Sequence, residues 1–330
     1  MDNNKILAIQ ASAEDYEWQI LDRVKETPDT FTYVFSPVTT SQHFPFSIGQ
    51  FVTISALLKR PTASGNLEES VVQRTYSIAS SPKRDLIELT IKCEKPYGHI
   101  NPVTKKADGF AAYFSEQIKI GDKVSVRFNP NKDHFLSRID EGMEKNIAYW
   151  SGANGAESAR CLIQYMDDTK DPELCLTLFY SNPTLCTCSE AQSNNTMNVI
   201  YYNWLIDMAK KVENLKVVFT FTRQKELDFS SDHPRIIYRK GRFFFKPDGT
   251  PERTLSKYHR NIESSFNPIC GSSGFINGIV KRADGRIERG RGIMQNLLEI
   301  EGIRPEQIDK EQFYLHVEGA NKQTKLFQKM

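Results

Sequence analysis

The rhythm of the sequence changes near residue 146, and this change limits the possible folds more than any other feature. Before it, short segments rich in β-branched and aromatic residues mostly alternate between apolar and polar positions, which is typical of strands. These segments are residues 31–35, 51–55, 71–79, 86–92 and 123–128. Turn-forming residues separate them, and one helical segment at 111–118 interrupts the series. Many short strands joined by turns predict an antiparallel β-barrel or sandwich over residues 16–135.

After residue 146, apolar strands alternate with amphipathic helices. Strands are expected at 147–150, 174–180, 216–222 and 268–270, helices at 157–166, 199–212 and from about 274, and a last strand at 312–317. Such alternation predicts a doubly wound parallel sheet, in which ligands bind beyond the carboxyl ends of the strands. A chain of 330 residues also exceeds the size that one core usually serves, so two domains are expected.

Composition excludes several classes of function. The chain is 39% hydrophobic and 25% charged, as in a soluble globular protein, and its formal charge of +2 gives no reason to expect binding to nucleic acid or membranes. Residues 1–18 lack the apolar core of a signal peptide, and no run reaches transmembrane length. Six scattered cysteines predict reduced thiols in a cytoplasmic protein, and the lone Cys186 and Cys188 pair does not predict a metal site.

The segment Arg74-Thr75-Tyr76-Ser77 carries the most specific chemistry. In a strand, Arg74 and Tyr76 emerge on the same face, with the Ser77 hydroxyl near the strand's end. A guanidinium binds phosphate oxygens in a fork, and an aromatic face stacks on a planar ring. The segment fits an anionic cofactor with a planar heterocycle, such as a flavin dinucleotide. An exposed strand with an ordinary Arg and Tyr is the alternative.

Two glycine-containing turns follow strands of the second half. Residues 151–155 (SGANG) and 270–274 (CGSSG) each lie between a predicted strand and a predicted helix. Small residues at such turns let backbone N–H groups approach a ligand closely. Glycines between a strand and a helix are common in α/β folds, so each turn alone is weak evidence for a ligand site. The two turns together, after an Arg-x-Tyr-Ser segment, are stronger evidence.

Taken in order, these features resemble the ferredoxin-NADP reductase superfamily, over residues 16–317. Residues 46–52 (FSIGQFV) resemble the segment before its flavin strand, and Arg74-Thr75-Tyr76-Ser77 matches its flavin motif. Residues 109–112 (GFAA) resemble the loop that completes the pyrophosphate site, and Cys270-Gly271 followed by Phe275 resembles the segment near the nicotinamide. The resemblance implies a FAD-binding β-barrel domain over residues 1–140 and an NAD(P)-binding α/β domain with a C-terminal tail over 141–330.

The resemblance also implies roles for individual residues. Arg74 would bind the flavin pyrophosphate, Tyr76 would stack on the isoalloxazine, and Ser77 and Cys270 would be the catalytic-site residues. The implied flavin contacts are Arg74, Thr75, Tyr76, Ser77, Ile91, Lys92, Cys93, Gly109, Phe110, Ala111 and Ala112. The implied nucleotide contacts are Gly152, Asn154, Gly155, Arg223, Cys270 and Gly271.

The second half departs from the family pattern at two positions. Glu157 places a carboxylate in the first turn of a helix, where it either points away from a bound pyrophosphate or weakens its binding. Asn182 stands where relatives often have an arginine, and Thr222-Arg223 better resembles the place where they hold the 2′-phosphate of NADP. Local basic charge around Arg223 is either a phosphate-binding edge or a solvated face. NADPH is therefore preferred over NADH.

The predicted activity is that of a FAD-dependent NAD(P)H oxidoreductase that passes electrons to a separate acceptor, because neither end carries the cysteine spacing of an iron–sulfur domain. Basic residues at 281–291 are either a docking surface for a small acidic redox protein, such as a ferredoxin or flavodoxin, or a solvated surface in which Glu288 is interspersed. The alternatives are a flavin-binding or interaction protein with a degenerate nucleotide site, and a quinone-type reductase of small molecules. Phe313 and Tyr314 are candidates for the aromatic residue that covers the flavin in relatives.

Overall fold

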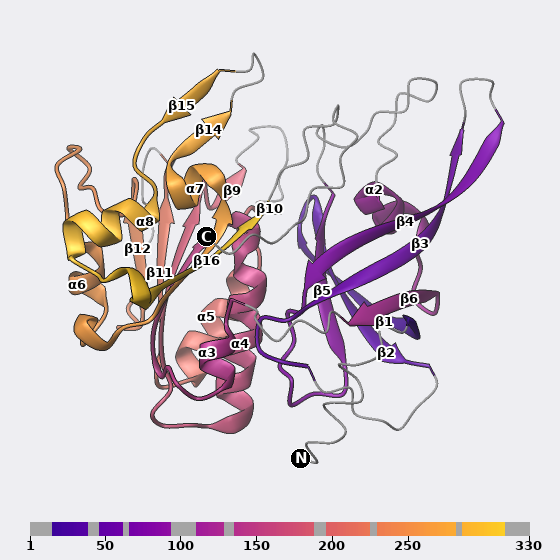
Figure 1. Cartoon of the computed structure of the whole chain (residues 1–330), viewed down its shortest axis with the longest axis horizontal. Helices are drawn as coiled ribbons and strands as arrows, with labels where there is room; N and C mark the ends of the chain where they lie inside the picture. Colours follow the sequence, from indigo (N-terminus) through magenta and orange to yellow (C-terminus); the bar gives the residue numbers. More distant parts are fainter. Residues whose placement is uncertain are drawn as a thin grey trace. The chain divides into compact units, whose positions relative to one another are not determined.

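The computed structural model describes residues 15–38, 46–61, 66–93, 110–128, 135–187, 196–224, 230–281 and 286–313. The chain forms two compact units (Figure 1). The first runs to Ser137 and includes Arg160–Tyr165, and the second contains the other described residues. No helix in the described part of the chain is both long and apolar enough to cross a membrane.

The first unit is a six-stranded antiparallel sheet of order β4-β3-β6-β1-β2-β5. At its open edges, the Ala79 amide just beyond β4 donates to the Glu88 carbonyl in β5 at 2.8 Å, so the sheet curls toward a barrel. The predicted barrel-like architecture is confirmed. The elements are β1 (Asp15–Thr27), β2 (Thr30–Pro37), β3 (Phe51–Pro61), β4 (Leu67–Ser77), β5 (Ile87–Lys92), β6 (Lys123–Phe128) and α2 (Phe110–Gln117).

Aromatic side chains fill the inside of this sheet. The Phe114 ring on α2 meets the Tyr33 ring of β2 edge to face at 5.2 Å, and the Tyr33 hydroxyl donates to the Phe114 carbonyl at 3.1 Å. Trp18 and Phe128 pack on the opposite part of the same core. The alternating apolar positions of the strands account for this core, because alternate side chains of a strand point to one face.

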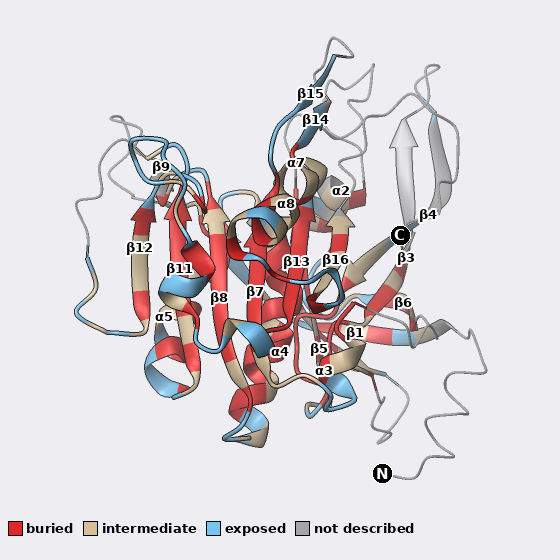
Figure 2. Cartoon of the chain, turned by 60° about the vertical axis from the view of Figure 1, so that its left-hand side comes forward, coloured by how far each residue is buried: buried red, intermediate tan, exposed pale blue. Residues whose placement is uncertain are grey.

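The second unit is a six-stranded parallel sheet of order β12-β11-β8-β7-β13-β16. Its four central strands, β11, β8, β7 and β13, are buried almost throughout, whereas the edge strands β12 and β16 are mostly half-buried (Figure 2). Near-complete burial is typical of parallel strands covered on both faces. Its strands are β7 (Asn146–Gly152), β8 (Cys175–Asn182), β11 (Leu215–Phe221), β12 (Ile236–Lys240), β13 (Asn267–Ser272) and β16 (Ile308–Phe313), with two short pairs, β9 (Cys186–Thr187) with β10 (Thr196–Met197) and β14 (Ile279–Lys281) with β15 (Ile287–Arg289). The helices that follow the first sheet are α3 (Ser137–Asp140), α4 (Ala156–Thr169), α5 (Tyr202–Lys211), α6 (Thr254–Tyr258), α7 (Ser273–Asn277) and α8 (Ile293–Asn296). The middle of α4, Arg160–Tyr165, belongs to the first unit.

The strand order contains a switch point between β7 and β13. From β7 the chain proceeds outward through β8, β11 and β12, then returns to the other side of β7 to form β13 and β16. In doubly wound sheets, ligands bind where the order reverses, beyond the carboxyl ends of the strands. The two glycine turns predicted from the sequence follow β7 and β13, so both lie at this point.

Two predicted elements differ from the structure. The helix expected from about residue 274 is the short α7, which ends at Gly278 with φ of 71° and gives way to the β14–β15 hairpin. A Cβ at Gly278 would lie 2.3 Å from the Gly290 carbonyl oxygen, so only glycine fits where the chain turns into the hairpin. The last strand begins at Ile308, four residues before the predicted start.

Candidate functional site

The Arg-x-Tyr-Ser segment forms the carboxyl end of β4. Arg74 and Tyr76 pair with Ile54 and Val52 of β3, so they occupy one face of the sheet. The Arg74 side chain is exposed, and its guanidinium donates to the Gln73 carbonyl at 2.8 Å. Within the described residues no carboxylate pairs with Arg74, so most of its N–H donors remain open to a ligand.

The other residues of the segment, Thr75, Tyr76 and Ser77, are less accessible than Arg74. The Thr75 hydroxyl hydrogen-bonds with the Thr53 hydroxyl on β3 at 3.2 Å. Ser77 is buried, with 4% of its surface exposed. The half-buried Tyr76 ring lies against the buried Phe110 ring, with 6.0 Å between their centroids. Tyr76 is therefore held in place from below by the start of α2.

The end of β5 meets the first turn of α2. The Cys93 thiol donates to the Ala111 carbonyl at 3.1 Å, and the Cys93 amide donates to the Asp29 carbonyl at 2.6 Å. Burial raises the pKa of the Cys93 thiol, which favours its neutral form. Ile91 is fully buried and Lys92 partly exposed.

The structure thus brings together three sequence-predicted segments: the ends of β4 and β5 and the start of α2. Phe110 is a core residue, so only its backbone can serve a ligand. Gly109 lies outside the described residues. Ala112 belongs to α2, but its side chain lies outside the described part.

Three glycines of the second unit, Gly152, Gly155 and Gly271, lie so close to neighbouring atoms that a Cβ would not fit. At Gly155 a Cβ would lie 2.2 Å from the Cys270 carbonyl oxygen, so the turn after β7 presses on the end of β13. At Gly152 and Gly271 a Cβ would lie 2.9 Å and 2.8 Å from the Phe275 ring. Phe275 therefore covers both glycine backbones that the sequence assigns to the nucleotide. Asn154 keeps a buried side-chain oxygen without a hydrogen-bond partner among the described residues.

Cys270 sits in a buried acidic cluster. Its thiol donates to a Glu311 carboxylate oxygen on β16 at 3.4 Å, and the Tyr149 hydroxyl donates to the Gly155 carbonyl at 3.1 Å. Burial, and after it the charge of Glu311, raises the pKa of Cys270 well above its usual value, so the group is a neutral thiol. The same two causes raise the pKa of Glu157 well above its usual value.

Glu157 is buried at the start of α4. Only 6% of its surface is exposed, and its charge acts on Glu311 and Cys270 beneath the turn. Sequence reasoning did not identify Glu311 or Tyr149. The sequence of β16 alone does not show that Glu311 is buried. Its place beside Cys270 follows from the pairing of β16 with β13.

Asn182 and Arg223, the two residues near the expected phosphate site, differ in their solvent exposure. Asn182 is buried at the end of β8, and its carbonyl accepts from the Thr222 amide at 3.0 Å. Arg223 is exposed, and its amide donates to the Pro183 carbonyl at 2.8 Å. Thr222 lines a pocket at this edge of the sheet, and Arg223 does not.

This pocket, called here the hairpin pocket, has a volume of about 360 Å³. It is lined by residues at the carboxyl ends of β8 and β11 and by residues of the β14–β15 hairpin. That hairpin is exposed and extends beyond the sheet (Figure 2). Sequence reasoning assigned some of its lining residues, such as Thr222 and Phe275, to separate sites and did not predict that they share one pocket, because they come from separate segments. The lining consists of Ser181, Thr222, Arg242, Phe243, Phe245, Gly274, Phe275, Gly278, Val280, Glu288, Arg289, Gly290, Arg291, Gly292, Ile293 and Asn296.

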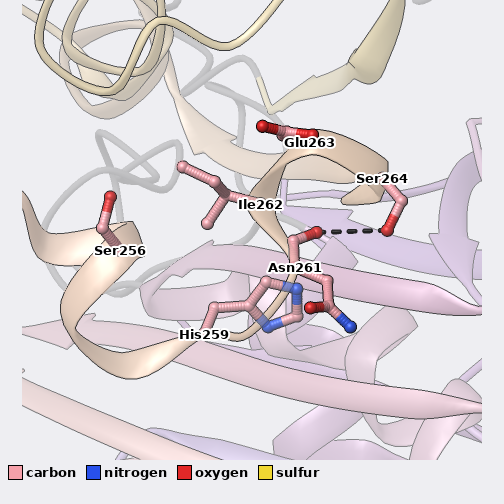
Figure 3. A pocket seen from close by; sticks show the side chains of 6 residues that line it. All are labelled: Ser256, His259, Asn261, Ile262, Glu263 and Ser264. Atoms are coloured by element: carbon pink, nitrogen blue, oxygen red, sulfur yellow. Dashed lines mark hydrogen bonds between the residues drawn. The ribbon is translucent and has the colours of Figure 1, made fainter.

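A second pocket lies at the opposite, amino-terminal edge of the sheet (Figure 3). It is lined by Ser256, His259, Asn261, Ile262, Glu263 and Ser264. Two of the loop's backbone carbonyls are already used: the Asn146 amide donates to the Asn261 carbonyl at 2.9 Å, and the Gln307 amide donates to the Glu263 carbonyl at 3.0 Å. His259 hydrogen-bonds with the Thr177 hydroxyl at 2.9 Å. These contacts anchor the loop.

No protein-family model and no curated protein matches the sequence. Solved structures do match, and they show that the chain has the two-part fold of FAD- and NAD(P)-binding reductases of the ferredoxin-NADP reductase type. The predicted fold is therefore confirmed.

Three of these structures illustrate the likeness. The FAD/NAD-binding domain of nitric oxide dioxygenase from Vibrio cholerae O1 biovar El Tor has a TM-score of 0.57 and 15% identity, over 91% of this chain and 99% of that one. Ferredoxin-NADP⁺ reductase from Plasmodium falciparum has a TM-score of 0.53 and 11% identity, over 91% and 96%. A ferredoxin NADP⁺ reductase from Neisseria gonorrhoeae with bound FAD and NADP has a TM-score of 0.50 and 17% identity, over 79% and 88%.

Proposed function

We propose that the protein is a FAD-dependent NAD(P)H oxidoreductase, with FAD bound by residues 1–140 and the nucleotide by residues 141–330. The observation that carries the proposal is the convergence of Arg74 and Tyr76 with the start of α2 and the end of β5. When bound, the flavin supplies the redox chemistry, by accepting a hydride and releasing electrons to a separate acceptor. The protein's residues then bind, orient and shield it.

The residues present fit such a cofactor. The exposed Arg74 guanidinium has open donors for the pyrophosphate, and the start of α2 adds the partial positive charge of a helix end. The Tyr76 ring is braced by Phe110 and offers a face for stacking. Ser77 would orient the reactive edge of the ring, and the backbone of Ile91, Lys92 and Cys93 would run along it.

The experiment is an anaerobic titration of the purified protein with NADPH, followed by absorbance. A yellow protein that loses its absorbance near 450 nm supports the proposal, and a yellow protein that is not bleached sinks the reductase activity. A colourless protein that cannot be reconstituted with FAD sinks the flavin site as well. Arg74→Gln should weaken FAD binding about tenfold or more, since a charge-assisted bond to phosphate is lost. Arg304→Gln, in the second unit, is the matched control.

The acceptor is proposed to be a small acidic redox protein, a ferredoxin or flavodoxin. The β14–β15 hairpin supports this, because its pairing places Ile279, Ile287 and Arg289 on one face. Ile279 and Ile287 are 41% and 60% exposed, so apolar contact and positive charge are offered together. Reduction of a quinone with no effect of a ferredoxin would instead indicate a small-molecule reductase.

A second candidate is a flavin-binding or interaction protein whose nucleotide site is degenerate. The Phe275 ring favours it, because the ring covers the Gly152 and Gly271 backbones that a nucleotide would approach. A Phe275→Ala variant separates the two functions. If the wild-type protein bleaches with NADPH, the ring yields to the nucleotide; if only the variant bleaches, the site is closed in the native protein.

A further inference from the structure

The second pocket, at the amino-terminal edge of the parallel sheet, contains a buried histidine nitrogen without a partner. His259 is only 6% exposed, and its Nδ1 is occupied by the Thr177 hydroxyl of β8 at 2.9 Å. Its Nε2 points to the other side of the ring, into the pocket (Figure 3), and has no hydrogen-bond partner among the described residues. A buried polar atom in this state calls for a partner that the protein itself does not supply.

This nitrogen is suited to donate a hydrogen bond. Burial, and after it the charge of Lys216, lowers the pKa of His259 to about 4, so the ring is neutral near pH 7. A neutral imidazole carries one N–H. When the Thr177 hydroxyl donates to Nδ1, that N–H is at Nε2 and faces the pocket. The ring then offers a donor to a ligand oxygen.

Two cations beside the pocket have no counter-charge from the protein. Lys216, at the start of β11, is half-buried, and its Nζ donates to the Tyr258 carbonyl at 2.8 Å, next to His259 in the chain. Arg260 follows His259 and is exposed. Within the described residues, neither cation has an ion pair with a carboxylate. Burial, and after it the charge of Arg260, lowers the pKa of Lys216, so the two cations lie close enough to repel each other.

The rest of the lining leaves room for an anion and a small organic group. The pocket has a volume of about 530 Å³, within the range of small-ligand sites. Ile262 contributes a half-buried apolar side chain, and the Ser264 hydroxyl donates to the Asn261 carbonyl at 3.1 Å (Figure 3). Glu263 is the one carboxylate among the described lining residues, so the two nearby cations outnumber it.

We propose that the second pocket binds a phosphate group, either inorganic phosphate or the phosphate of a small monoester. Arg260 supplies a fork and Lys216 a point charge, and the His259 Nε2 donates to a further oxygen. A bound phosphate gives both cations a counter-charge and the buried nitrogen a partner. The site lies at the opposite edge of the sheet from the nucleotide, so it goes beyond the proposed function.

Calorimetric titration with inorganic phosphate and with glycerol 3-phosphate, at constant ionic strength, tests the site. Both should bind saturably; tighter binding of the monoester identifies a phosphorylated compound as the ligand, and equal or weaker binding identifies free phosphate. Succinate should bind at least about tenfold more weakly, because each carboxylate group has only two oxygens for three donors. Equal affinity for succinate and phosphate, or no saturable binding of either phosphate compound, would overturn the proposal.

Variants locate the anion. Arg260→Gln and Lys216→Gln should each weaken phosphate binding about tenfold or more, since a charge-assisted bond is lost. Glu263→Gln should strengthen it severalfold, because a nearby negative charge is removed. Arg260 and Glu263 are exposed, so these two variants keep the fold. The control is Lys257→Gln, which removes a charge that already pairs with Glu252 at 2.6 Å. Equal weakening by Lys257→Gln and Arg260→Gln would contradict the site.

Nuclear magnetic resonance of the histidines gives a second readout. An anion beside an imidazole favours its charged form, so phosphate should raise the pKa of His259 from about 4. His259→Gln identifies the signal among the six histidines, and sodium chloride at the same ionic strength should leave the pKa nearly unchanged. A pKa that does not respond to phosphate would overturn the role of Nε2. These measurements involve no redox chemistry, so their failure would leave the proposed reductase function intact.

Discussion

At the scale of single residues, the environment of each ionisable group decides its chemistry. Glu157 and Cys270 come from the turns after β7 and β13, yet both lie in the same buried cluster with Glu311. Isolated carboxylates in a low-dielectric interior are costly, so the pKa of Glu157 is raised and its carboxyl group keeps its proton at pH values where it would be ionised in water.

Glu157 therefore makes stability depend on pH in a defined direction. The pKa of Glu157 in the folded state is raised above the ordinary value of 4.5. Its contribution to the free energy of unfolding is therefore complete below pH 4.5 and is lost as the pH rises through the folded-state pKa. Glu157→Gln should raise the unfolding temperature more at pH 8 than at pH 5. Thermal unfolding followed by circular dichroism measures the difference, and the exposed Glu299→Gln is the control. An equal effect at both pH values would contradict the burial of an ionisable carboxyl.

His259 makes the opposite prediction. Burial, and after it the charge of Lys216, lowers the pKa of His259 from 6.5 to about 4. Its contribution to stability is complete above pH 6.5 and is lost as the pH falls toward about 4, by up to about 3 kcal/mol at one pKa unit per 1.4 kcal/mol. His259→Gln should flatten the pH dependence of unfolding by urea in this range. His233→Gln is the comparison, and the same flattening there would argue against His259.

At the scale of elements, the turns at the switch point are fixed by backbone contact. The Gly155 backbone packs on the Cys270 carbonyl, and this contact lets α4 start directly after β7. Gly290 also lies in a turn of this unit, but a Cβ there would approach nothing closer than 3.7 Å.

Gly155→Ala should destabilise the second unit by about 2 to 3 kcal/mol, because a rigid backbone must move to admit the methyl group. Gly290→Ala should change stability by less than about 0.5 kcal/mol. Urea unfolding of both variants gives the comparison. Similar stability of the two variants would mean that the turn after β7 accommodates a side chain.

At the scale of the whole molecule, the basic hairpin projects beyond the carboxyl edge of the second sheet (Figure 1). A surface of this charge speeds association with an acidic partner, and salt weakens the effect. We therefore expect the hairpin to affect the rate of electron transfer to an acidic protein acceptor and to leave the chemistry at the flavin unchanged.

Reversal of one hairpin charge tests this role. Arg286→Glu should slow NADPH-driven reduction of a plant-type ferredoxin severalfold at low salt and leave reduction of ferricyanide unchanged. Arg260→Glu, in the loop before β13, reverses a charge at the other edge of the sheet and should have a smaller effect. Stopped-flow rates over a range of ionic strength measure both. Equal slowing by the two variants would indicate net charge instead of a docking surface.

Much of the fold was predictable from the sequence, because periodicity of two and of 3.6 residues is a local property. The alternating positions in β2 and β5 and the apolar face of α4 sufficed to predict the two architectures. The hairpin was missed because Gly278 ends α7 through a contact with Gly290, twelve residues away, that no local pattern reveals. The Arg-x-Tyr-Ser segment was found because its residues are adjacent in the chain.

The sequence by itself determined the two architectures, the position of Arg74 and Tyr76 on one face, and the two glycine turns. The tertiary structure decided which way Glu157 points, that Phe275 covers Gly152 and Gly271, and which arginines line a pocket. The physical reason is distance along the chain. Burial, cavities and unpaired charge depend on neighbours that only folding brings together.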